Sequence, residues 1–153
     1  MTETIKWQQG AEVLTAFDKE ISCRCDVRNG LNYRRKADQV VYTIPDKEPY
    51  QPRIFPKGTW VVGTPLERTD SYLAPFYIPT NAWQPVNVWE VKNGLYVKKT
   101  DKTVADKAYG LHHSTSNTTL GCIKIMNLQD LLWLANMVAE TIKNGNGVWF
   151  EVS

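Results

Sequence analysis

Short runs of β-branched and aromatic residues, separated by turn-forming residues, constrain the fold of this chain more than any other feature. They stand at residues 39–45 (QVVYTIP), 58–63 (GTWVVG), 86–91 (VNVWEV) and 94–99 (GLYVKK). Such residues favour strands because they pack well on a pleated surface. Asn93-Gly94, between the last two runs, is typical of a tight hairpin turn. The eight prolines between residues 45 and 85 indicate long ordered loops and short or edge strands.

One helix is predicted near the C-terminus, over residues 128–143. Apolar residues recur there at helical spacing, Asn127 is a suitable N-cap, and Asp130 lies in the first turn, where the helix dipole favours a carboxylate. The glycine-rich NGNG at 144–147 ends the helix. The closing VWFEVS at 148–153 then predicts a final strand.

The first 38 residues are less regular, and two of their segments favour different structures. GAEVLTAFDKEI at 10–21 is compatible with one or two helical turns, whereas ISCRC at 21–25 predicts a strand. We expect one domain over residues 1–153, with 1–38 as an N-terminal extension or a cap. The predicted fold class is α+β, mostly β: a β-sandwich or barrel with one C-terminal helix followed by a final strand.

Composition excludes several classes of function. With 42% hydrophobic and 22% charged residues the chain is typical of a globular domain, and no run approaches the roughly 20 apolar residues of a membrane span. A net charge of +2 is too small to indicate binding to nucleic acid. The opening MTETIKWQQGAEVL lacks the features of a signal peptide, so we expect synthesis in the cytoplasm. Three cysteines predict at least one free thiol rather than a disulfide framework.

Both histidines and one cysteine fall within a single polar segment, residues 110–125 (GLHHSTSNTTLGCIKI). A cysteine nucleophile needs a base and N–H donors for the oxyanion that forms on attack at a carbonyl. His112 or His113 can supply the base if the strands YGLHH and CIKI lie side by side, joined by the loop STSNTT. The N–H groups around Gly121 can hold the oxyanion. The alternative is that Cys122 is an inert buried thiol and the histidines are surface residues.

This segment resembles the signature of the L,D-transpeptidase catalytic domain family. That signature has a Gly-Ile-His-Gly-type element, a polar loop, and Ser-His-Gly-Cys-Ile-Arg followed by Met-x-Asn-x-Asp; here GLHHS, STSNTT and TLGCIKIMNLQD take those places. Upstream, VVYTIP and RIFPKGTWVVG resemble the family's strand ending in Phe-Pro or Ile-Pro and its Thr-Pro-x-Gly-x-Tyr/Trp segment. The helix, glycine-rich stop and last strand resemble its usual ending. The resemblance covers residues 39–153, and Gly-Cys-Ile-Lys at 121–124 is its most specific part.

Three substitutions and a short loop distinguish the chain from the family's bacterial housekeeping branch. Leu120 stands in the place of a histidine, Thr119 in that of a serine and Lys124 in that of an arginine. These features resemble the shorter forms found among secreted antibacterial effectors and phage-encoded cell-wall enzymes. Because the histidine next to the cysteine is absent, the base is His112 or His113, and matching Gly-Leu-His to Gly-Ile-His favours His112.

The resemblance implies acyl transfer through a thioester on peptidoglycan stem peptides, without a metal or cofactor. Cys122, deprotonated by His112, would attack the carbonyl that precedes a D-amino acid and expel that residue. Transfer to an amine gives L,D-transpeptidation or D-amino-acid exchange, and transfer to water gives L,D-carboxypeptidase activity. Gly121 would form the oxyanion turn, and His113 would either orient the base through its backbone carbonyl or simply pack or be solvated. The implied substrate contacts are Tyr109, Ser114, Thr119 and Lys124.

The implied place of action is the periplasm or cell wall, reached through a secretion system that serves a target cell or during phage lysis. The implied partners are stem peptides together with an immunity protein or a delivery component, with no nucleic acid and no membrane span. Two other functions stay open. One is a silent wall- or glycan-binding module using aromatic side chains, and the other is a thiol- or zinc-dependent regulatory domain using Cys23, Cys25 and the histidines. The aromatic candidates are Trp60, Trp83, Trp89, Tyr96 and Tyr109.

Overall fold

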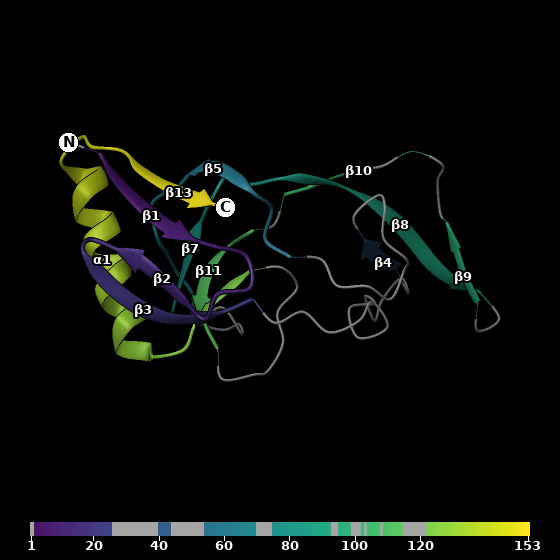
Figure 1. Ribbon diagram of the computed structural model, residues 1–153, viewed down its shortest axis with the longest axis horizontal. Coiled ribbons are helices and arrows are strands. Elements are labelled where there is room, and N and C mark those ends of the chain that lie inside the picture. The colour runs from purple at the N-terminus through teal and green to yellow at the C-terminus, as the bar shows by residue number, and fades with distance from the viewer. Residues whose placement is uncertain are drawn as a thin grey trace.

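The computed structural model describes residues 2–25, 40–43, 54–69, 75–92, 95–98, 102, 104–107, 109–114 and 122–153. Within these residues the chain forms thirteen strands and one helix (Figure 1). In chain order they are β1 (Glu3–Trp7), β2 (Val13–Ala16), β3 (Lys19–Arg24), β4 (Val40–Thr43), β5 (Gly58–Val61), β6 (Leu66–Glu67), β7 (Phe76–Pro79), β8 (Gln84–Lys92), β9 (Leu95–Lys98), β10 (Val104–Asp106), β11 (Gly110–His113), β12 (Ile123–Ile125), α1 (Leu128–Lys143) and β13 (Val148–Val152).

Nine of these strands form one curled sheet in the order β5-β13-β1-β2-β3-β12-β11-β7-β6. The β1–β13 and β11–β12 pairs are parallel, and the other pairs are antiparallel. Two strands far apart in this order meet again, because Val62 after β5 forms a bridge with Thr80 after β7. The sheet therefore curls back on itself. The predicted class, α+β and mostly β with a C-terminal helix and a last strand, is confirmed.

The N-terminal segment contributes strands to the middle of this sheet. The prediction of helical turns over residues 10–21 (GAEVLTAFDKEI) is wrong. Instead, β2 and β3 form a hairpin whose turn residues, Phe17 and Asp18, have φ of 50° and 60°. Buried and exposed side chains alternate along β2, which is the period of a strand. The strand predicted over ISCRC is confirmed as β3. Residues 3–24 are thus part of the sheet, with β1 beside β13 and β3 beside β12, and are neither an extension nor a cap.

The helix α1 has the predicted bounds and packs on the apolar side of the sheet. The side chain of Asn127 accepts hydrogen bonds from the N–H groups of Gln129 and Asp130, as predicted for an N-cap. Gly145, with φ of 82°, follows the helix end. The buried helix residues lie against β7, β11, β12 and β13; they are Leu131, Leu134, Ala135 and Val138. Burial of these four apolar side chains against the sheet stabilises the helix.

A smaller sheet has the order β10-β8-β4, with β9 paired to β8. The predicted hairpin is confirmed by the antiparallel register of Lys92 with Leu95, while its two turn residues lie outside the described ones. The other strands predicted at 39–45, 58–63 and 86–91 correspond to β4, β5 and β8. No helix among the described residues is long and apolar enough to cross a membrane.

Candidate active site

Strands β11 and β12 bring the histidine and cysteine elements of residues 110–125 together. They pair in parallel, and His112 lies in register with Lys124. Residues in register on neighbouring strands point to the same face, as do residues two apart on one strand. Cys122 directly precedes β12 and stands two residues before Lys124. His112 and Lys124 therefore share one face of the sheet, which we call the polar face. Continuing the alternation of β12 by one residue puts Cys122 on the same face.

The opposite face of the same strands belongs to the core. Leu111, Ile123 and Ile125 are completely buried there, under the helix. His113 alternates with His112, so its side chain does not share the polar face. Its Nδ1 atom lies 2.9 Å from the carbonyl oxygen of Ile125, which ties the ring to the backbone of β12. The register thus favours His112 over His113 as the partner of Cys122.

His112 is held in the tautomer that a general base requires. Its ring is 5% exposed, and its Nδ1 atom lies 3.1 Å from the carbonyl oxygen of His113. A carbonyl can only accept, so Nδ1 carries the hydrogen, and in the neutral ring Nε2 keeps its lone pair. Burial lowers the pKa of His112 below 6.5; the hydrogen bond to His113 opposes this, and the charges of Lys124 and His113 add to it. The ring is therefore neutral at pH 7.

Lys124 is fully buried on the polar face, whereas Cys122 is half-buried. A completely buried lysine is rare in proteins. Its positive charge adds to the lowering of the pKa of His112. A cation on the same face as a cysteine favours the thiolate over the thiol. The arrangement therefore combines a neutral imidazole, a buried cation and a thiol.

Tyr77 is a residue of this face that the sequence analysis missed. It lies in register with His112 on the other side of β11, so the two share the polar face. A Cβ added to Gly110 would come within 2.5 Å of the Tyr77 ring and hydroxyl and 2.6 Å of the carbonyl oxygen of Ile78. Only glycine fits at that position without displacing Tyr77. The glycine of the GLHH element therefore makes room for an aromatic wall beside the histidine.

Arg24 is a second residue that the sequence analysis did not select. It lies in register with Lys124 across β3 and β12, which puts both cations on the polar face. The Arg24 guanidinium is 3.9 Å from the carboxylate of Glu12 and is partly exposed. The motif ISCRC marked this segment as a strand, but its pairing partner is about 100 residues away in the chain. No local signal predicts such a pairing.

The structure places the remaining predicted site residues in different environments. Tyr109 was expected to contact substrate, but it is 1% exposed, and its hydroxyl is hydrogen-bonded to Gln84 and Asp106. Its ring packs against Phe55, so it belongs to the core, where it joins β11 to β8 and β10. Ser114 is half-buried directly after β11. Thr119 and Gly121, together with the expected oxyanion turn, lie outside the described residues.

Of the two N-terminal cysteines, Cys23 lies in surroundings that disfavour its thiolate. Cys23 is completely buried, and burial raises its pKa to about 12, with the charges of Cys25 and Glu12 adding to the rise. Metal binding requires the thiolate, which this environment disfavours. In the part of the chain that the structure describes, no three His, Cys, Asp or Glu side chains gather as a metal site would require.

No family model, curated protein or solved structure matches the chain. Its function is therefore inferred from its own residues and from the resemblance of its motif.

Proposed function

We propose that this chain is a cysteine-dependent enzyme that acts on peptidoglycan stem peptides through a thioester, as an L,D-transpeptidase, D-amino-acid exchanger or L,D-carboxypeptidase. Cys122 is the nucleophile and His112 the base. The observation that carries the proposal is the parallel register of β11 with β12, which puts a neutral histidine on the face of the cysteine. The substrate class comes from the resemblance of residues 110–125 to the transpeptidase signature.

The geometry supports proton transfer between these two residues. Extending the β11–β12 register by one residue puts Cys122 level with Gly110, two residues from His112 along β11. Diagonal neighbours on adjacent strands are about 7–8 Å apart at Cα, a span that a histidine side chain can bridge. Nε2 of His112 is the ring nitrogen that retains a lone pair, because Nδ1 donates to the carbonyl of His113. Nε2 is therefore the atom that takes the thiol proton.

In the first half-reaction the Cys122 thiolate attacks the carbonyl carbon that precedes the terminal D-amino acid. A C–S bond forms, and the C–N bond to the leaving residue breaks. The proton that His112 took from the thiol passes to the leaving amine. Because the pKa of His112 is lowered, chiefly by burial, its protonated form readily gives this proton up.

In the second half-reaction the thioester passes its acyl group to an acceptor. His112 removes a proton from an incoming amine or water, and the thiol leaves as the new C–N or C–O bond forms. An amine from another stem peptide gives a cross-link, a free D-amino acid gives exchange, and water gives hydrolysis. His113 contributes its main-chain carbonyl, which holds the His112 ring in one tautomer through all of these steps.

Two cations on the polar face fit an acidic substrate. Stem peptides end in a carboxylate, and the face carries Lys124 and Arg24 in register. The Lys124 charge also stabilises the Cys122 thiolate, while the partly exposed Arg24 can reach a carboxylate in solvent. The substrate sets the place of action at the periplasm or cell wall. The protein would reach that place by secretion into a target cell or during phage lysis. If it is a secreted effector, its partner would be an immunity protein.

The test compares the unaltered protein with Cys122→Ala on disaccharide-tetrapeptides, by mass spectrometry of released D-alanine and of exchange with an added D-amino acid. We expect the substitution to lower both rates by at least about 10³-fold, because no other group can form the thioester. Cys25→Ala is the matched control: Cys25 is also half-buried, but it follows β3 on the face opposite to Cys122. Intact-mass measurement should show the acyl adduct in the Cys25→Ala protein and not in Cys122→Ala.

Equal product from the unaltered protein and Cys122→Ala would refute the cysteine mechanism. No product from any of the proteins, with binding to purified sacculi retained, would favour a wall-binding module in place of an enzyme.

A further inference from the structure

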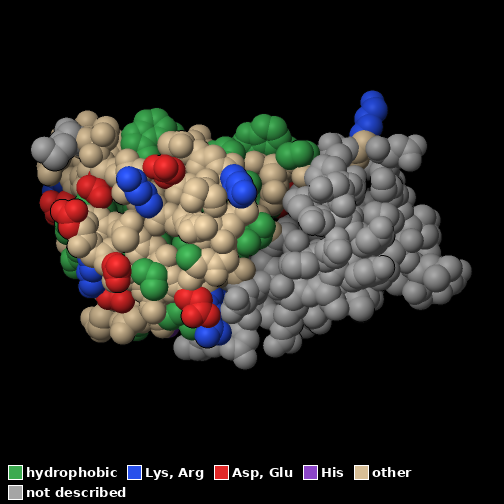
Figure 2. Space-filling model, viewed as in Figure 1, with side chains coloured by type: hydrophobic (Ala, Val, Ile, Leu, Met, Phe, Trp, Pro, Cys, Tyr) green, Lys and Arg blue, Asp and Glu red, His purple; other side chains and the backbone are tan. Residues whose placement is uncertain are grey.

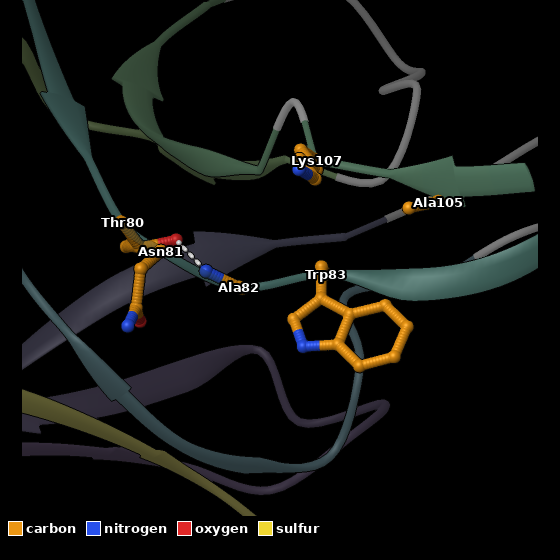
Figure 3. A pocket seen from close by; sticks show the side chains of 6 residues that line it. All are labelled: Thr80, Asn81, Ala82, Trp83, Ala105 and Lys107. Atoms are coloured by element: carbon orange, nitrogen blue, oxygen red, sulfur yellow. Dashed lines mark hydrogen bonds between the residues drawn. The ribbon is translucent and has the colours of Figure 1, made fainter.

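A recess lies where the chain passes from β7 to β8. It has a volume of about 610 Å³, within the range of roughly 300–1,000 Å³ typical of small-molecule sites. The segment after β7 forms one wall and the end of β10 forms the other (Figure 3). Among the described residues, those that line it are Thr80, Asn81, Ala82, Trp83, Ala105 and Lys107.

Trp83 gives this pocket an exposed aromatic surface. It is 50% exposed, more than any other large hydrophobic side chain among the described residues. In Figure 3 the side chains of Trp83 and Asn81 extend from the same side of the segment that leads into β8. Figure 2 shows hydrophobic side chains along the edge formed by β13, β5 and the start of β8. A tryptophan beside polar groups at a wet surface is typical of a recognition site.

The polar wall of the pocket is held rigidly by the sheet. The Oδ1 atom of Asn81 accepts a hydrogen bond from the N–H of Val61 at 2.7 Å, and the N–H of Asn81 donates to the carbonyl of Val61 at 3.0 Å. The Thr80 hydroxyl donates to the carbonyl of Tyr109 at 2.6 Å and accepts from the N–H of Ala82 at 3.2 Å. The Asn81 amide is thereby fixed with its Nδ2 hydrogens directed away from β5. A preorganised donor next to an aromatic face requires little ordering when a ligand binds.

We propose that this pocket binds an amino-sugar residue of the glycan strand that carries the stem peptide. The apolar face of a pyranose ring stacks on an indole, as other flat apolar surfaces do. Asn81 Nδ2 and the Lys107 ammonium supply donors for the acetamido carbonyl and the ring hydroxyls. The identity of the sugar rests on the proposed function, whereas the pocket itself stands on its own geometry.

The pocket follows β7, the strand that pairs with β11, by a few residues along the chain. Tyr77 and Pro79 of β7 lie in register with His112 and Gly110, and Trp83 follows Pro79 by four residues. Four residues span at most about 14 Å. A stem of three to four residues between the sugar and the scissile bond covers a similar distance of about 10–14 Å. Cys122, directly before β12, lies two strand spacings of about 4.8 Å from β7, so a substrate that occupies the pocket and the thiol must also extend across those strands.

The test measures affinity in the Cys122→Ala protein, in which the substrate is not consumed. Calorimetry compares a disaccharide-tetrapeptide, the sugar-free tetrapeptide and chitotetraose. We expect the disaccharide to raise affinity for the tetrapeptide by at least about tenfold, with measurable binding of chitotetraose. Adding Trp83→Ala should reduce the ratio of the two affinities, with and without the disaccharide, to about one. Trp149→Ala is the matched control, since this tryptophan on β13 is 38% exposed and lies outside the pocket, so the ratio should not change.

A second variant separates recognition from structure. Asn81→Asp keeps an acceptor for the N–H of Val61 and removes the amide donor, so it should lower the sugar-dependent ratio by severalfold without lowering the melting temperature. Equal affinity for the two tetrapeptides, or a ratio that persists in Trp83→Ala, would overturn the proposal. D-alanine release by the unaltered protein without any preference for the disaccharide would remove only the glycan site. Chitotetraose binding that depends on Trp83, with no D-alanine release, would remove only the enzyme.

Discussion

The two faces of β11, β12 and β3 differ in almost every physical respect, although they share one backbone. On the face under α1, Leu111, Ile125 and Cys23 are completely buried among apolar neighbours. On the polar face, His112 and Lys124 are buried as well, but as titratable groups, and burial together with the charge of Lys124 lowers the pKa of His112. Strand alternation alone separates the two environments.

This difference shows how a small domain can hold buried titratable groups without losing stability. Burial of the apolar face contributes roughly 25 cal/mol for each Å² removed from water, and that contribution offsets the cost of burying polar groups opposite. Two cysteines occupy the two faces, Cys23 in register with Ile125 and Cys122 directly before Ile123. Their surroundings decide which of them can react.

The largest effect that we expect is a difference in alkylation between these two thiols. Burial, with the charges of Cys25 and Glu12, raises the pKa of Cys23 to about 12, so about one Cys23 thiol in ten thousand is ionised at pH 8. Cys122 is half-buried on the face of Lys124. Iodoacetamide at pH 8, followed by peptide mass spectrometry, should modify Cys122 at least about 10³-fold faster than Cys23.

Alkylation in urea provides the control, because both thiols should then react at similar rates. Equal rates in the native protein would mean that the two faces do not differ in reactivity, and the assignment of Cys122 as a nucleophile would lose its physical basis.

The next effect concerns the apolar face alone. Ile125→Ala removes a completely buried side chain in contact with the core, so it should lower the free energy of unfolding by about 2–5 kcal/mol. The carbonyl of Ile125 that accepts the His113 hydrogen bond is retained. Urea unfolding gives the stability, and D-alanine release per folded molecule should stay within about twofold of the unaltered protein. A loss of turnover much larger than the loss of folded protein would show that the two faces are coupled.

Local patterns predicted the parts of the fold that depend on neighbouring residues. The helix α1, with Asn127 as its cap, and the β8–β9 hairpin are determined by short-range spacing and turn chemistry. The β2–β3 hairpin was missed because its turn, Phe17-Asp18, contains no glycine or asparagine. A positive φ at both positions has no clear signal in that pair of residues.

The candidate site could be predicted only in part, for a related reason. His112, Lys124 and Cys122 lie within thirteen residues, so motif order and strand alternation were enough to bring them together. Tyr77 and Arg24 reach the same face through strands that are distant in the chain, and no spacing in the sequence encodes those registers. Tyr109 was wrongly predicted to contact substrate, because aromatic residues next to a motif pack in the core as often as they line a pocket.

The smallest effect is a shift in the titration of His112, and it tests the polar face directly. Burial lowers the pKa of this ring, and the charge of Lys124 lowers it further. The acidic limb of the rate of D-alanine release should therefore fall below pH 6.5, because the base stays neutral to lower pH. The His112 ring binds fewer protons in the folded state than in the unfolded state. Its contribution to the free energy of unfolding is therefore complete above pH 6.5 and is lost as the pH falls through the folded pKa.

The variant Lys124→Gln removes one cause of the lowered His112 pKa. It should move the His112 titration upward, by less than the remaining effect of burial. NMR of the two histidines measures this without reference to turnover, and His113→Phe assigns the signals while keeping the carbonyl that binds Nδ1. An unchanged His112 titration in Lys124→Gln would show that the buried cation does not act on the base, and the role of Lys124 would then reduce to its effect on the thiolate.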